Sequence, residues 1–156
     1  LKRHDVLSAD EMKIKVEELI EDCDIFISAA AVSDFKPKEI YKNKIKKKEN
    51  EKHLNLKMDK NSDILKVISE KNLNLKTVGF AAETENLLSN AKKKLSQKKL
   101  DLIVANDVSN KDIGFDSDEN EVTLITKKEQ KKIKKASKKI VSKKIVEFIA
   151  SKVVND

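Results

Sequence analysis

Two short and mostly apolar runs, residues 24–32 and 100–105, constrain the fold of this chain more than any other feature. Runs of this length that are rich in Ile, Val, Leu and Ala are typical of strands buried on both faces of a parallel sheet. A third candidate strand, 77–81, lies between them in the sequence. Segments with helical periodicity separate the strands, and they predict helices at 8–22, 62–71 and 84–99. This alternation indicates βαβ units and an α/β fold with a mainly parallel sheet.

The capping box Ser8-Ala9-Asp10-Glu11 marks the start of the first helix. A Lys-rich loop is expected over 35–52, followed by a strand over 53–58. Near the C-terminus, β-rich segments at 121–126 and 131–135 are close enough to form an antiparallel hairpin. Ser137 can cap a final helix, and we expect its inward residues to be Ile140, Val141, Ile145, Phe148, Ile149 and Val153.

Length and composition narrow the class of protein. A chain of 156 residues suits one domain, and its single Cys excludes an internal disulfide. No apolar run approaches the ~20 residues of a membrane span, and no signal peptide is recognisable. The net charge is +7, with 11 Lys against 3 acids over 126–156. Such charge suits a polyanion or nucleic acid, but a solvated Lys-rich helix face is the more common explanation.

Polar residues follow the predicted strands where a ligand of a parallel sheet would bind. Asp34 follows the first strand, Thr84 the second and Asn106 the third. Each also has a purely local explanation as a helix cap or a turn residue. Because the carboxyl ends of parallel strands meet at one edge of a sheet, their coincidence favours a binding site there.

Five residues of the Lys-rich loop, Lys44-Ile45-Lys46-Lys47-Lys48, sharpen this interpretation. Ammonium groups beside the strand ends suit a ligand with several negative charges, such as a nucleoside triphosphate. Only Gly79 and Gly114 are present, so a Gly-rich phosphate loop is excluded. Phosphate binding would have to use lysines and helix ends.

Six motifs occur in order along the chain, and together they are highly specific. They are AAAVSDFKP (29–37), KIKKK (44–48), KNSDIL (60–65), GFAAET (79–84), LIVANDV (102–108) and GFDSDENEVTLI (114–125). In these motifs the sequence resembles the phosphopantothenate–cysteine ligases (phosphopantothenoylcysteine synthetases) of coenzyme A biosynthesis, in their bacterial, CTP-using form.

The resemblance implies a Rossmann-like three-layer sandwich, a homodimer and a cytoplasmic location, with no nucleic-acid or membrane partner. It implies a ligase that joins 4′-phosphopantothenate and cysteine through an acyl-cytidylate, with CTP as co-substrate and Mg²⁺. In many bacteria this domain is fused behind a decarboxylase that carries FMN, a cofactor of that half alone.

Site residues are also implied by the resemblance, at positions that match the motifs. Lys44 is expected to be catalytic at the phosphates, and Asn106 to support the site. Ser62–Leu65 lie in the stretch that matches the family's Asn-Pro-Asp-Ile segment, which helps hold the cytidine. The expected nucleotide-binding residues are Ser28, Ala29, Ala30, Asp34, Lys44, Ser62, Asp63, Ile64, Leu65, Phe80, Lys94 and Lys98.

Two departures from the family accompany the resemblance. Ser62 replaces the usual Pro, and the family's N-terminal strand and Gly-rich segment have no counterpart in 1–156. We therefore expect one ligase domain that lacks that segment, and a fragment that is inactive alone. Two other hypotheses remain open: a non-catalytic nucleotide-binding module and, less favoured, a basic nucleic-acid-binding domain.

Overall fold

The computed structural model describes residues 1–39, 41, 43–46, 53–71, 74–108 and 117–154, and its centre is a five-stranded sheet in the order β1-β4-β5-β6-β7. The first three strands in this order are parallel, and the last two are antiparallel to their neighbours. This arrangement confirms the predicted α/β class and its antiparallel C-terminal hairpin. The strands are β1 (Ile25–Ser28), β4 (Lys76–Glu83), β5 (Leu102–Asp107), β6 (Glu119–Ile125) and β7 (Gln130–Ser137).

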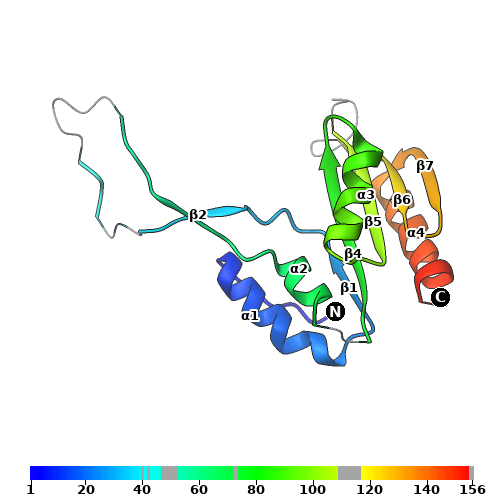
Figure 1. Ribbon diagram of the computed structural model, residues 1–156, viewed down its shortest axis with the longest axis horizontal. Helices are drawn as coiled ribbons and strands as arrows, with labels where there is room; N and C mark the ends of the chain where they lie inside the picture. The colour runs from blue at the N-terminus through cyan, green and yellow to red at the C-terminus, as the bar shows by residue number, and fades with distance from the viewer. Residues whose placement is uncertain (40, 42, 47–52, 72–73, 109–116, 155–156) are drawn as a thin grey trace.

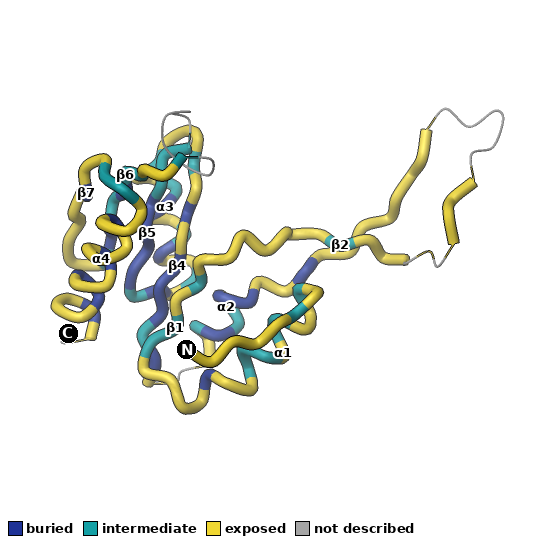
Figure 2. The backbone as a smooth tube through the Cα atoms, turned by 180° about the vertical axis from the view of Figure 1, so that it is seen from behind, coloured by how far each residue is buried: buried dark blue, intermediate teal, exposed yellow. Residues whose placement is uncertain are grey.

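Helices cover both faces of the sheet and make it the middle of three layers (Figure 1). Val78, Leu102 and Val104 point to the face covered by α4 (Lys138–Phe148) and its π-helical extension η2 (Ile149–Val153). The alternate positions, among them Ala81 and Ile103, face α3 (Leu87–Gln97). Figure 2 shows the buried backbone concentrated in these central strands. The period of two along each strand builds two separate apolar layers.

The N-terminal helices form a third apolar cluster beside β1. Ser8 caps α1 (Ala9–Leu19) by accepting a hydrogen bond from the Glu11 N–H at 3.2 Å. This confirms the predicted cap at Ser8. The Glu11 carboxylate reaches back to the Leu7 N–H at 2.8 Å, one residue before the N-cap N–H that a capping box uses, so the reciprocal bond is shifted by one residue. Through α1 and the 3₁₀ turn η1 (Ile20–Asp22), the chain packs on α2 (Ile64–Ser69) by way of Ile20 and Ile68.

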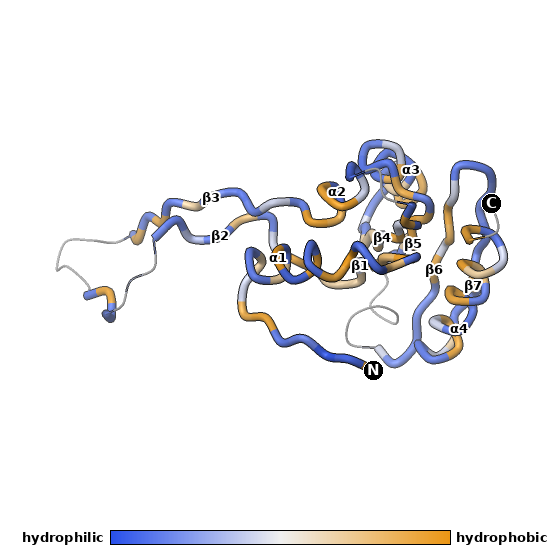
Figure 3. The backbone as a smooth tube through the Cα atoms, turned by 90° about the horizontal axis from the view of Figure 1, so that it is seen from below, coloured by the Kyte–Doolittle hydropathy of each residue, from blue (hydrophilic) through white to orange (hydrophobic). Residues whose placement is uncertain are grey.

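An extended arm leaves this body between β1 and α2 (Figures 1 and 3). Its base is a two-stranded antiparallel pair, β2 (Phe35–Pro37) and β3 (Met58–Lys60). The prediction of a loop throughout 35–52 is therefore wrong at 35–37, and the strand predicted over 53–58 begins only at Met58. Strands of three residues pair with partners some twenty residues away, so they leave no local periodicity to detect.

Several other predicted features differ from the structure. The predicted strand 24–32 ends at Ser28, where its pairing with β4 stops, and it is an edge strand with Ile27 44% exposed, not one buried on both faces. Thr84 caps no helix, since α3 begins after Asn86. Ile140 is 49% exposed rather than inward, because it lies one position away from the stripe that α4 buries. Lys47, Lys48 and Gly114 lie outside the described residues.

Candidate functional site

A cleft of about 630 Å³ opens at the carboxyl ends of β1 and β4. Three segments form most of its wall: the stretch after β1, the turn from β3 into α2, and the end of α3. Of the predicted residues, the cleft brings together Ser28, Ala30, Asp34, Ser62, Asp63, Ile64, Leu65, Phe80 and Lys98. β1 ends at Ser28, in register with Gly79 of β4, and β4 runs on to Glu83, so the residues after β1 lie beside the second half of β4 and the sheet itself creates this convergence.

One wall of the cleft carries an ion pair between α2 and the end of α3. The Asp63 carboxylate caps α2 by accepting from the Lys66 N–H at 3.1 Å, and its second oxygen lies 2.7 Å from Lys98 Nζ. Burial by itself raises the pKa of the Asp63 carboxyl. The two hydrogen bonds and the charges of Lys98 and Lys66 lower it, and because their sum outweighs the effect of burial, the pKa lies below its usual value. Asp63 therefore stays ionised and holds the Lys98 ammonium at the cleft.

A second wall of the cleft is the segment that contains Asp34. Its backbone is tied to the turn before α2 by the Asn61 N–H, which donates to the Asp34 carbonyl at 2.8 Å. The Asn61 side chain is 7% exposed and donates to the Ser33 carbonyl at 2.9 Å. Asn61 was not predicted as a site residue. The signal that could have found it is its place inside the KNSDIL motif, one residue before the predicted Ser62.

Phe80 supplies the large aromatic side chain of the cleft. It lies in the second half of β4, next to Val104 of β5, and remains 41% exposed. An apolar ring of this size left open in a cleft offers a flat face on which a planar ligand group can stack. Lys60 and Lys66 add positive charge to the same lining.

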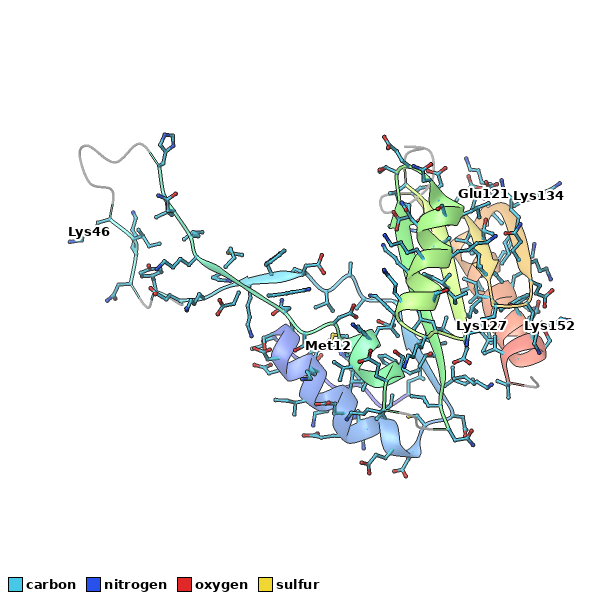
Figure 4. All side chains as sticks on the ribbon, viewed as in Figure 1. Met12, Lys46, Glu121, Lys127, Lys134 and Lys152 are labelled. Carbon is cyan, nitrogen blue, oxygen red and sulfur yellow. The ribbon has the colours of Figure 1, made fainter. Side chains whose placement is uncertain are left out.

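Four predicted site residues are not part of the cleft lining. Ala29 follows β1 and is exposed. Lys44 belongs to the arm and is exposed, and the nearby Lys46 lies far from the sheet (Figure 4). Lys94 pairs with Glu83, its Nζ lying 2.6 Å from a carboxylate oxygen. The expected convergence of Asp34, Lys44, Phe80 and Lys94 thus holds in this structure for Asp34 and Phe80 only.

Lys94 and Asn106 occupy a neighbouring position at the same end of the sheet. Glu83, the last residue of β4, accepts from Lys94 and, at 3.1 Å, from Asn90 Nδ2 of α3. Asn106 pairs with Ala82 of β4 and has a buried side-chain oxygen with no hydrogen-bond partner in the described part of the chain. This polar cluster lies outside the cleft lining, at the carboxyl ends of β4 and β5.

The carboxylates of the cleft are the side chains there that could bind a metal ion. Asp34 and Asp63 both line it. No group of three or more His, Cys, Asp or Glu side chains suited to hold an ion occurs among the residues that the structure describes. A hard cation that keeps several waters and binds ligand phosphates needs only one or two carboxylates, so this pair suits Mg²⁺ better than a fully protein-bound metal.

Comparisons with known proteins point to one family. The model for the DFP family, described as the DNA/pantothenate metabolism flavoprotein C-terminal domain, matches residues 1–153. A coenzyme A biosynthesis bifunctional protein, CoaBC, of Vibrio vulnificus is 42% identical over 148 residues, which are 94% of this chain and 37% of the relative. The chain thus spans little more than a third of that relative's length.

Solved structures agree with this match. The crystal structure of the C-terminal domain of a CoaBC superposes with a TM-score of 0.76 and 30% identity, over 97% of this chain and 65% of that one. A Cab2 mutant in complex with phosphopantothenate-cysteine superposes with a TM-score of 0.65 over 91% of this chain and 51% of that one. At 19% identity, this second likeness concerns the fold.

Among the described residues, no helix has the length and apolar character needed to cross a membrane. The family match covers nearly the whole chain and confirms the resemblance predicted from the six motifs. This chain belongs to the DNA/pantothenate metabolism flavoprotein C-terminal domain family.

Proposed function

We propose that this chain is the ligase domain that joins 4′-phosphopantothenate to cysteine at the expense of CTP, in coenzyme A biosynthesis. Its CoaBC relatives support the pathway, and the ligand of the Cab2 structure is the product that such a ligase would form. The observation that carries the proposal is the cleft, which unites Asp34, Phe80 and Lys98 from three distant segments.

The proposed reaction has two steps. A carboxylate oxygen of 4′-phosphopantothenate attacks the α-phosphorus of CTP, and the bond to the β-phosphate oxygen breaks, which releases pyrophosphate and leaves an acyl-cytidylate. The cysteine amine then attacks the acyl carbon, CMP leaves with the electron pair, and the amine loses a proton. Activation is needed because a free carboxylate is a poor acylating agent.

The nucleoside part of CTP would lie against Asp34 and Phe80. The Phe80 ring offers a stacking face for the cytosine, and the Asp34 carboxylate can accept hydrogen bonds from ribose hydroxyls. Ser28, Ala29 and Ala30 are small, so the backbone after β1 can approach the nucleotide closely. The turn 62–65 closes the other side of the cleft.

Cations are needed because an anionic carboxylate attacks a polyphosphate. Lys98 is placed for this at the cleft, held by Asp63 at 2.7 Å. Lys94 would contribute from its pair with Glu83, and Lys44 would contribute if the arm approaches the cleft. Mg²⁺ held by Asp34, Asp63 and the phosphates would neutralise charge on the triphosphate.

Homodimer formation would use the arm. Its large apolar side chains are exposed: Phe35 55%, Tyr41 59%, Leu54 60%, Leu56 52% and Met58 47%. A two-stranded ribbon cannot bury such side chains by itself, but a second copy of the same arm could cover them. In this proposal FMN serves only a decarboxylase half, where one is fused to the ligase.

Calorimetric titration with Mg-CTP tests the binding part of this proposal. We expect saturable binding that weakens about tenfold or more in Lys98→Gln, because a charge-assisted phosphate contact is lost. Lys93→Gln is the matched control, since Lys93 is exposed on the same helix and lies outside the cleft. ATP in place of CTP tests the base preference.

Product analysis tests the chemistry. Pyrophosphate release that requires both CTP and 4′-phosphopantothenate, in the chain within its full-length protein, would support the ligase. Binding of CTP without pyrophosphate release there would instead identify a non-catalytic nucleotide-binding module. A gel shift with RNA or DNA that weakens steeply with salt, without CTP binding, would favour the nucleic-acid hypothesis.

A further inference from the structure

Asn61 is the most deeply buried polar side chain in the wall of the cleft, with 7% of its surface exposed. It lies between β3 and α2, where the arm joins the body of the protein. Its backbone N–H donates to the Asp34 carbonyl at 2.8 Å and so continues the β2–β3 pairing, whose last pair is Phe35 with Lys60. Asn61 therefore connects the two walls of the cleft at the base of the arm.

The side-chain amide of Asn61 adds further hydrogen bonds to this connection, and they fix which way the amide group faces. Asn61 Nδ2 lies 2.9 Å from the Ser33 carbonyl oxygen and 3.5 Å from Ser33 Oγ. The carbonyl can only accept, so the amide nitrogen must face it. The Ser33 hydroxyl donates to the Phe35 carbonyl at 3.0 Å, which leaves its oxygen free to accept from Asn61. Ser33, Asp34 and Phe35 are thus all fixed relative to Asn61.

The side-chain oxygen of Asn61 differs from the side-chain nitrogen. Asn61 Oδ1 is buried and has no hydrogen-bond partner in the part of the chain that the structure describes. A buried acceptor without a partner destabilises a fold, and an apolar residue here would avoid that cost. The side-chain donor bonds hold Ser33, the residue before Asp34, while the backbone N–H of Asn61 holds Asp34 itself.

We infer that Asn61 is a positioning residue: it clamps the Asp34 segment to the turn that begins α2 and thereby sets the width of the cleft between Asp34 and the Asp63–Lys98 pair. This inference rests on the proposed nucleotide site, because the width matters only to a ligand that touches both walls.

Asn61→Asp tests the donor bonds with almost no change in shape. An ionised carboxylate cannot donate, and it would place an oxygen against the Ser33 carbonyl. A protonated carboxyl can donate, and burial favours protonation. We expect Asn61→Asp to bind Mg-CTP about tenfold more weakly than the wild type near pH 8, and within about threefold of it near pH 5.5.

The wild type measured at each pH controls for titration of CTP itself and of the charged groups around Asn61. These groups are Asp34, Asp63, Lys60, Lys66 and Lys98. Thr77→Val is the matched structural control. Thr77 is a buried polar residue at the start of β4, and its hydroxyl lies 3.1 Å from the Asp101 carboxylate, outside the cleft. It should lower stability without changing the affinity for CTP.

Residue-resolved hydrogen exchange separates this inference from the proposed function. If Asn61 is the clamp, the backbone N–H of residue 61 should exchange faster in Asn61→Asp than in the wild type. Near pH 8 we expect a difference of at least about tenfold after correction for intrinsic rates, with or without a ligand. Unchanged exchange at that amide would overturn the clamp. Absence of CTP binding in the wild type would overturn only the proposed function. Equal loss of affinity in Asn61→Asp at both pH values, or an equal loss in Thr77→Val, would also overturn the positioning role.

Discussion

The sheet and the arm both carry large apolar side chains, but the two regions are stabilised in different ways. In the sheet, Val78, Leu102 and Val104 have no exposed surface. In the arm, Phe35 and Leu56 remain more than half exposed, and each of its paired strands has three residues. The sheet stabilises itself by burying both of its faces. The arm depends on Asn61 and the β2–β3 pairs at its base, and its large apolar side chains stay exposed.

Replacement of a leucine in each region should give the largest difference. Leu102→Ala should lower the free energy of unfolding by about 2–5 kcal/mol, because it leaves a cavity under α4. Leu56→Ala should change it by no more than about 0.5 kcal/mol in dilute protein, since Leu56 is 52% exposed. Urea unfolding measures both. A cost at Leu56 as large as that at Leu102 would show that the arm buries this side chain against a second molecule.

Gly79 tests how closely α2 packs on the sheet. A Cβ at this position would lie 2.7 Å from Leu65 Cδ2 and 2.9 Å from Leu100 Cδ1. Gly79→Ala should therefore destabilise the fold by about 1–2 kcal/mol, as both leucines must repack. Because Leu65 also lines the cleft, the affinity for CTP should fall as well.

The double variant Gly79→Ala, Leu65→Ala checks the cause. Its loss of stability should be smaller than the sum of the two single losses, because the second change removes the nearer clashing atom. Additive losses would mean that the crowding at Gly79 does not involve α2.

Asp63 tests the wall of the cleft through pH. Asp63→Ala should cost about 1 kcal/mol near neutral pH, and Asp63→Asn less, because Asn still caps the helix. The folded-state pKa of Asp63 is lowered, so its stabilisation is full above the usual carboxyl pKa of 3.8 and is lost as the pH falls through the lower folded value. The deficit of Asp63→Ala should therefore shrink below about pH 4. A deficit that grows on acidification would contradict this assignment.

Lys99 should give the smallest effect, in the opposite direction. Lys99 follows the C-cap residue of α3, and its φ is 51°, where a residue with a side chain is unfavourable. This conformation lets the Leu100 N–H donate to the Leu95 carbonyl at the end of the helix. Lys99→Gly should raise stability by about 0.5–1 kcal/mol. Asn86 has the same φ, but Asn tolerates it, so Asn86→Gly should change little. Thermal unfolding of the two variants measures this difference. Equal gains in stability for Lys99→Gly and Asn86→Gly would mean that backbone strain at Lys99 is not the cause.

The predicted site residues agree best with the cleft lining where a motif lies at the end of a strand or at the start of a helix. Asp34, Phe80 and Asp63 were all predicted, and all line the cleft. Lys44 and Lys94 were expected beside them, but the arm carries one away and Glu83 holds the other. Neither the path of an arm nor a competing carboxylate on a neighbouring strand can be read from the spacing of lysines.

The sequence by itself determined the α/β class, the buried strand that became β5, the helix caps at Ser8 and Ser137, and the family. These features depend on local periodicity, on side chains within one helical turn, or on motif order. Tertiary structure decided that β1 lies at the edge of the sheet, that 35–37 pairs with 58–60, and that Asn61 fixes Asp34. Such features depend on contacts between distant segments, and no local pattern records which partner a strand end or a buried amide will meet.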